Sequence, residues 1–221
     1  ASAALHFVQR NRHFLAIANY SSQSGKAVAI YEWDGMAAHW RLFYEAEARG
    51  TAELAHCAIP DGGGDLLVFA TWFDGAFGAM SHVVRIDAEA DPPVAHVQSL
   101  PTAGSHDAEC RRVPRHGGAD ELLLVLASGR DDRELRALDT GVYSWEGVAF
   151  RERQRLPSVG AHDVEVLGGG ADGRLALAIA NQGGGDVCNG TVDGWEWSSS
   201  ERTFSPAATL RAGCAVYVSC W

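Results

Sequence analysis

The chain has 221 residues, of which 47% are hydrophobic and 21% charged, so it can bury a sizeable core. Its net charge of −10 argues against a nucleic-acid or anionic-membrane partner, because both attract positive surfaces. No apolar run approaches the roughly 20 residues that a membrane-spanning helix needs.

The first 49 residues predict four short strands joined by turns. A polar strand comes first, a continuous apolar strand (HFLAIANY) second, and a strand ending in two aromatic residues third. A further strand precedes the next turn. The four strands are expected at residues 4–11, 13–20, 27–35 and 40–48.

The same order of strands returns three times. The apolar strand recurs as DLLVFATW, ELLLVLAS and RLALAIAN, at intervals of 52, 57 and 53 residues. A period near 50 residues with several strands per copy predicts an all-β propeller of four-stranded antiparallel blades. The blades are expected at residues 1–49, 50–102, 103–158 and 159–211.

The apolar strands lack alternation, which indicates that neighbouring blades cover both of their faces. The aromatic pairs Tyr31/Trp33, Tyr143/Trp145 and Trp195/Trp197 are expected to pack between blades, with one ring on each face of the blade.

Residues 212–221 resemble the innermost strand of a further blade. This favours a larger propeller, of up to seven blades. A complete small propeller with an added strand and closure by a second chain are the alternatives.

The repeated words resemble the EAR (epitempin, or EPTP) repeat, as found in the leucine-rich glioma-inactivated proteins. The resemblance implies seven-bladed extracellular modules for adhesion and receptor binding, without enzymatic activity. Two departures are Val84-Arg85-Ile86 in place of Tyr-x-Trp, and Ala208 in place of a glutamine. The matching stretches are GAHDVE (160–165), LAIAN (15–19 and 177–181), YEW (31–33), YSW (143–145) and FRERQ (150–154).

Asp107 and Asp163 occupy the same place near the start of two innermost strands, and Glu53 lies at a similar place in a third. Carboxylates that converge on the channel could hold Ca²⁺ or Na⁺ through oxygen ligands. The alternative is that these side chains cap a loop or bond the backbone of a neighbouring blade.

Three histidines on innermost strands, His56, His106 and His162, raise the alternative of a zinc enzyme. In a regular strand, however, adjacent side chains point to opposite faces. His106 and His162 are therefore expected to lie between blades, away from the aspartates that follow them. This disfavours a metal-dependent enzyme.

The loop at residues 72–80 is unusually apolar for a turn. Its Trp72, Phe77 and Met80 could dock a partner protein, or could instead fold back over the blade. The function that we expect is a non-catalytic interaction or adhesion module. The alternative is a structural subunit of a large assembly, as a lumenal or extracellular cap.

The remaining signals concern the compartment. Asn19 and Asn189 begin glycosylation sequons, which favours a secreted or lumenal protein. Cys57 and Cys110 fall at similar positions on adjacent innermost strands, so they form either a disulfide or two buried thiols. A pair among the late cysteines 188, 214 and 220 could staple the last blades.

Overall fold

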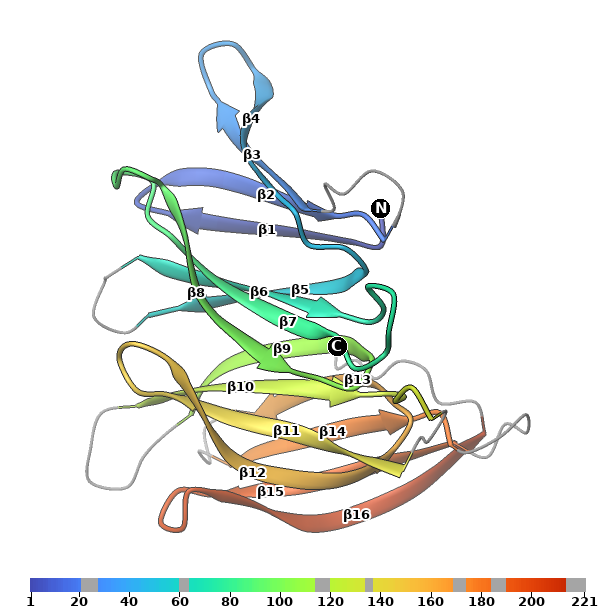
Figure 1. Ribbon diagram of the computed structural model, residues 1–221. Helices are drawn as coiled ribbons and strands as arrows, with labels where there is room; N and C mark the ends of the chain where they lie inside the picture. The colour runs from blue at the N-terminus through green and yellow to red at the C-terminus, as the bar shows by residue number, and fades with distance from the viewer. Residues whose placement is uncertain are drawn as a thin grey trace.

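The computed structural model describes residues 1–20, 28–59, 64–113, 120–133, 137–168, 174–183 and 190–213 (Figure 1). All of the regular structure in these residues is β, and they contain no helix that could span a membrane. Sixteen strands form four antiparallel sheets of four strands each, consecutive in the chain. The predicted all-β, four-stranded blade is therefore confirmed.

Each sheet takes its strands in chain order, apart from the direction in which they are counted. Blade 1 contains β1 (Ala3–Gln9), β2 (Arg12–Ala18), β3 (Val28–Asp34) and β4 (His39–Ala46). Blade 2 contains β5 (Thr51–Ala58), β6 (Asp65–Thr71), β7 (Met80–Ile86) and β8 (Val94–Pro101). Blade 3 contains β9 (Ser105–Val113), β10 (Glu121–Ser128), β11 (Ala137–Trp145) and β12 (Phe150–Val159). Blade 4 contains β13 (Ala161–Gly168), β14 (Leu175–Asn181), β15 (Gly190–Ser198) and β16 (Thr203–Gly213).

The first strands of consecutive blades, β1, β5, β9 and β13, lie next to one another and are the innermost strands. The blades then stack in chain order, as the sequence of colours in Figure 1 shows. The innermost strand runs away from the edge of the molecule where the N-terminus lies, on the right in Figure 1. The starts of these strands therefore meet at one end of the propeller axis.

The second strand of a blade is covered on both sides, as its continuous apolar sequence predicted. In β10 all eight residues are buried. Leu124 and Leu126 pack towards blade 2, whereas Leu123 and Val125 pack towards blade 4. The apolar sequence recurs because the second strand of each blade is buried between the two neighbouring blades.

The aromatic pairs pack between blades in part of the molecule, but the prediction of one ring on each face is wrong. Tyr143 and Trp145 both contact the core between blades 2 and 3. Trp195 and Trp197 both contact the core between blades 3 and 4. Residues two apart in a strand share a face, so both rings of a pair point towards the preceding blade.

Three hydrophobic clusters join blade 1 to 2, blade 2 to 3 and blade 3 to 4. Within the residues described above, no cluster joins blade 4 to blade 1, so these blades form an open arc. Strand β16 continues through Ala212 and Gly213, so the proposed start of a fifth inner strand at residue 212 is wrong. The rest of that predicted strand, residues 214–221, lies outside the described residues.

A glutamine side chain clips successive blades together at two interfaces. Gln154 of β12 donates from Nε2 to the Phe204 carbonyl (2.7 Å), and the Phe204 N–H donates to Gln154 Oε1 (2.8 Å). Gln98 of β8 makes the same pair of bonds with Phe150 at 3.0 and 2.9 Å. The side-chain amide thus satisfies backbone groups of an outermost strand that β15 or β11 leaves unpaired.

We expect Gln154→Ala to lower the free energy of unfolding by about 1 kcal/mol, because two hydrogen bonds at a partly buried site are lost. Gln154→Glu should lose about as much, since a carboxylate cannot donate to the Phe204 carbonyl. Urea denaturation measures both effects. The exposed neighbour change Ser205→Ala should be neutral, and an equally neutral Gln154→Ala would show that the clip contributes nothing.

Candidate functional site

Three of the four innermost strands carry a β-bulge near their start. The pairing register shifts between residues 51 and 53 of β5, between 105 and 108 of β9, and between 161 and 163 of β13. A bulge breaks the alternation of side chains, so two successive residues can serve the same side of the sheet. The bulges therefore bring equivalent residues of blades 2, 3 and 4 to one end of the axis.

These residues line a pocket of about 350 Å³ at the axis. His106 and His162 share it with Asp107 and Asp163, so the expectation that the histidines lie between blades, away from the aspartates, is wrong. The regular alternation on which that expectation depended is interrupted by the bulges. The complete lining is Ser2, Tyr20, Ala52, Glu53, Trp72, His106, Asp107, His162 and Asp163.

Three flat rings from three blades stack on one another across the pocket. The ring centroids of Trp72 and His106 are 3.7 Å apart, and those of His106 and His162 are 3.8 Å apart. Gly104 and Gly129 leave room for the indole, because a Cβ at either position would lie within 3 Å of the Trp72 ring. The stack ties the loop after β6 to the innermost strands β9 and β13.

Asp107 is held by the neighbouring blade. The Val164 N–H of blade 4 donates to its carboxyl at 2.8 Å, which is the backbone contact that the alternative interpretation expected. Burial raises the pKa of Asp107 well above its ordinary value, and the nearby Asp163 raises it further. Burial likewise raises the pKa of Glu53, whose carboxylate accepts the Leu54 N–H at 2.9 Å.

Two further groups, Glu109 beside the pocket and His106 in its lining, have shifted pKa values. Burial, together with the charge of Glu165, raises the pKa of Glu109 to about 7. Burial, together with the neighbouring His162, lowers the pKa of His106 to about 3. At neutral pH His106 is therefore an uncharged ring, and the buried carboxyls resist ionisation as long as no positive charge lies near them.

We expect Glu109→Gln to stabilise the protein at alkaline pH. Because the carboxyl binds its proton more tightly in the folded chain, its contribution is fully present below about pH 4.5 and is lost as the pH rises through about 7. The variant should gain about 2 kcal/mol over the wild type at pH 8 and nothing at pH 4.5, after allowance for partial solvent screening.

Urea denaturation at pH 4.5 and pH 8 measures this difference. Glu196→Gln, on the exposed part of β15, is the matched control and should show no such gain. If Glu109→Gln differed from the wild type by the same free energy of unfolding at both pH values, the raised pKa of Glu109 would be contradicted.

The third histidine considered for a zinc site, His56, lies elsewhere. Its Nε2 is 3.2 Å from an Asp65 oxygen, and its ring stacks on Phe7 at 4.9 Å. In the described part of the chain, no three His, Cys, Asp or Glu side chains are arranged to hold a metal ion. A channel cation at Asp107 and Asp163 stays a prediction.

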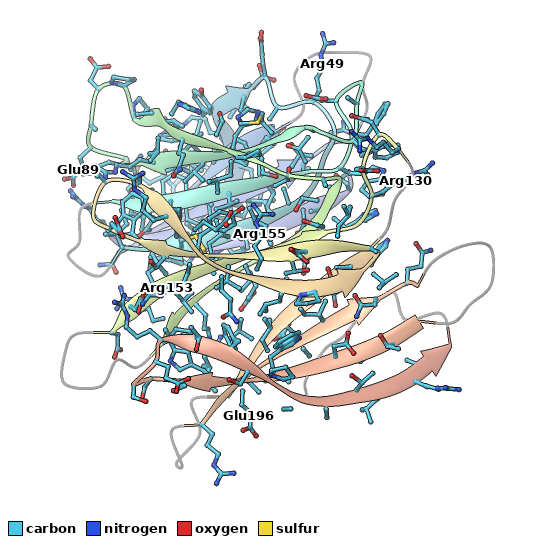
Figure 2. All side chains as sticks on the ribbon, turned by 60° about the horizontal axis from the view of Figure 1, so that its bottom comes forward. Arg49, Glu89, Arg130, Arg153, Arg155 and Glu196 are labelled. Atoms are coloured by element: carbon cyan, nitrogen blue, oxygen red, sulfur yellow. A yellow bond between two sulfur atoms is a disulfide. The ribbon has the colours of Figure 1, made fainter. Side chains whose placement is uncertain are left out.

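The loop at residues 72–80 leans on the next blade. The Phe77 and Gly78 N–H groups donate to the two Asp132 oxygens at 2.5 and 3.2 Å. The Arg130 guanidinium lies 4.7 Å from the centroid of the Phe77 ring, and Figure 2 shows Arg130 on the right, at the opposite end from Glu89. Trp72 lines the pocket, whereas Met80 begins β7 and is 37% exposed.

The cysteine and asparagine predictions fall partly within the described residues. Cys57 and Cys110 form a disulfide between β5 and β9, with their Cα atoms 5.3 Å apart. Asn19 is exposed directly after β2. Asn189 and the cysteines at 188, 214 and 220 lie outside the described residues.

Comparison with known proteins supports the fold alone. No protein-family model and no curated protein matches the chain. A functionally unknown protein from Desulfotomaculum acetoxidans DSM 771 aligns over 95% of this chain and 56% of its own, with 10% identity and a TM-score of 0.58. A GH43 β-1,3-galactosidase aligns over 92% of this chain and 44% of its own, with 10% identity and a TM-score of 0.55. The chain has a propeller-like fold of four-stranded blades. It spans about half the length of these two solved structures.

Sequence reasoning placed Trp72 in a docking loop and the aspartates in a channel, but did not connect them. It also missed Tyr20 and Ser2, which complete the rim of the pocket. A signal was present: Gly104 lies two residues before His106, and Gly129 follows the paired strand, so space for a ring was encoded next to the histidine.

Proposed function

We propose that this propeller segment is a non-catalytic interaction module of the EAR type, which binds a partner protein at the axial pocket and the adjoining 72–80 loop. The observation that best supports this proposal is the composition of the pocket. Three blades contribute the carboxyl groups of Glu53, Asp107 and Asp163, and these line the same pocket as the stack of rings. A basic side chain of the partner, arginine or lysine, is the group that this chemistry fits.

The charge of the site supports a basic ligand. Carboxylates and an uncharged imidazole offer acceptors, and the protein carries a net charge of −10. Burial makes ionisation of Asp107 and Glu53 unfavourable, and a positive group between them would relieve that penalty. Binding should therefore release protons, and affinity should increase as the pH rises.

The loop supports a protein as the source of the basic group. Phe77 touches the Trp72 ring at the rim, at a centroid distance of 4.9 Å, and Met80 presents an exposed thioether. An apolar rim beside an acidic pocket matches a partner surface in which one arginine or lysine is surrounded by apolar residues.

Two of the polar groups in the pocket already make hydrogen bonds within the fold, which supports binding over catalysis. The Ser2 hydroxyl donates to the Thr51 carbonyl at 2.9 Å, and Asp107 accepts the Val164 N–H. We propose no cofactor. A Ca²⁺ or Na⁺ ion in place of the basic side chain is the alternative occupant of the same carboxyls.

The compartment that we propose is extracellular or organelle-lumenal. The Cys57–Cys110 bridge supports it, because disulfides persist in oxidising compartments. The exposed Asn19 at the start of a sequon agrees with it.

A second candidate function is a structural subunit of a larger assembly. The uncovered face of blade 1, with Trp33 and Trp40 each more than one-third exposed, favours permanent contacts with other blades.

The test titrates Nα-acetyl-arginine and Nα-acetyl-lysine methylamides against the protein and follows the ring resonances of Trp72 and His162 by NMR. The basic probes should shift these resonances with millimolar affinity, about −4 kcal/mol. The neutral glutamine analogue should not. Asp163→Asn should weaken binding at least about tenfold, whereas the exposed Asp139→Asn should not.

A parallel titration with CaCl₂ separates the two cations. Shifts with Ca²⁺ alone, and none with either basic probe up to about 0.1 M, would overturn the protein-binding proposal in favour of a metal site. No shift with any probe would overturn both.

A further inference from the structure

Blade 2 differs from the other three blades at one position of its third strand. In every blade a shift in the pairing register of the third and fourth strands marks this position. The residue there is aromatic in blades 1, 3 and 4 and aliphatic in blade 2: Tyr31, Tyr143, Trp195 and Val84. Val84 belongs to the core between blades 1 and 2, so blade 2 lacks a ring on the face that meets blade 1.

The missing ring leaves a hollow between blades 1 and 2. In blade 3 the Tyr143 ring lies over Gly141, where an added Cβ would be only 2.7 Å from it. The register places His82 of blade 2 at the position of Gly141, and no ring covers it. A pocket of about 290 Å³ opens there, lined by Tyr44, Ala46, Glu47, Ala48, Phe69, His82, Val84, His96 and Ser99.

The bulge in β8 turns His96 and Ser99 towards this hollow together. In a regular strand, residues three apart lie on opposite faces. Here Val97 packs against the core between blades 2 and 3, and Gln98 bonds Phe150 of blade 3. Two successive residues thus serve the blade 3 side, which leaves His96 and Ser99 together on the blade 1 side.

Two imidazole nitrogens converge on one oxygen in the hollow. His82 Nδ1 and His96 Nε2 each lie 3.0 Å from Ser99 Oγ. The ring planes meet at 63°, with their centroids 6.2 Å apart, so the rings are not stacked. A hydroxyl has one proton, so it donates to at most one of the two nitrogens, and the other ring donates to it. Two imidazoles directed at one point are the arrangement that a pair of metal ligands adopts.

We infer that this hollow binds a divalent transition-metal ion, with His82 and His96 as nitrogen ligands and the Ser99 hydroxyl beside it. Imidazole suits Zn²⁺, Cu²⁺ and Ni²⁺. His96 is exposed, so its ring is free to turn to the metal–nitrogen distance of about 2.1 Å. Glu47, which lines the same hollow, adds negative charge that favours a cation.

A serine beside a histidine also raises the alternative of a catalytic nucleophile. In such sites a third group orients the base. Among the described residues, neither ring hydrogen-bonds a carboxylate, and the partner of both rings is Ser99. The arrangement therefore fits metal ligation better than nucleophilic catalysis.

Two imidazoles and a hydroxyl make a weaker site than three or four strong ligands, so we expect a dissociation constant on the order of 10 µM for Zn²⁺. The inference stands apart from the proposed function, because none of these side chains lines the axial pocket.

Isothermal titration of ZnCl₂ into the 221-residue protein at about pH 7.5, where imidazoles are mostly neutral, tests the inference. His82→Ala and His96→Ala should each weaken Zn²⁺ binding at least about tenfold. Ser99→Asp should strengthen it about tenfold, because a carboxylate is a better zinc ligand than a hydroxyl. In the wild type, the NMR ring resonances of His82 and His96 should shift with added Zn²⁺.

His13→Ala is the matched control. It removes a different pair of histidines, exposed on blade 1, in which His6 Nε2 lies 3.1 Å from His13 Nδ1. Zinc binding at the hollow should not change in this variant. Circular dichroism checks that each variant is folded, and the exposed His96 makes His96→Ala the decisive one.

Unchanged zinc affinity in His96→Ala would overturn the inference, as would loss of binding in His13→Ala. No binding up to about 1 mM ZnCl₂ would overturn it as well. A Ser99→Asp variant that binds Zn²⁺ no more tightly than the wild type would contradict the place given to the ion.

Discussion

Replacing both Cys57 and Cys110 by alanine should lower the free energy of unfolding by about 3 to 4 kcal/mol. The bridge joins residues 53 positions apart, so it removes a large loop-closure entropy from the unfolded chain. It also joins the innermost strands of blades 2 and 3. Guanidinium denaturation of the double variant beside the oxidised wild type measures the loss.

Reduction of the wild type by dithiothreitol gives a second reading of the same quantity. The reduced wild type and the double variant should agree within about 1 kcal/mol, because the unfolded chain lacks the cross-link in both. A wild type whose denaturation midpoint does not change on reduction would contradict the bridge, and would remove its support for an oxidising compartment.

Replacing Trp72 by alanine should cost about 3 kcal/mol of stability and abolish binding of the arginine probe. The indole fills the space beside Gly104 and Gly129 and covers one face of His106. Without it, water reaches His106, so the pKa of this histidine should rise from about 3 towards its ordinary range. NMR titration of the His106 ring separates this effect from a simple loss of folding.

Met80→Ala is the matched control for the loop. The side chain is exposed and lies outside the pocket lining, so stability should change by less than about 0.5 kcal/mol. A Trp72→Ala variant in which the His106 pKa stays near 3 and the probe still binds would show that the ring stack does not build the site.

The blades could be predicted from the sequence because their signals are local. The continuous apolar words at residues 65–72 and 121–128 became β6 and β10, which neighbouring blades cover on both sides. A period near 50 residues sets four strands per unit, and glycine-rich turns separate them. None of these inferences needed to know how one blade meets the next.

The site could not be predicted in the same way, because it depends on pairing register. A bulge in β9 decides whether His106 and Asp107 serve the same side of the blade or opposite sides. The bulge becomes visible only when β9 is paired with β10. The place of Trp72 in the pocket depends on three separate segments meeting. The prediction that the two rings of an aromatic pair lie on opposite faces of the blade was wrong for a simpler reason, since residues two apart in a strand share a face.

The central claim is that the acidic pocket at the axis takes a basic side chain. Isothermal titration of Nα-acetyl-arginine methylamide at several pH values, in two buffers with different ionisation enthalpies, tests it most directly. We expect binding to release protons in the pH range where the buried carboxyls still hold them, because a cation lowers the raised pKa values of Asp107 and Glu53, and we expect binding to be lost in Asp163→Asn. Binding of equal strength in Asp163→Asn, or no heat of binding in either buffer, would contradict it.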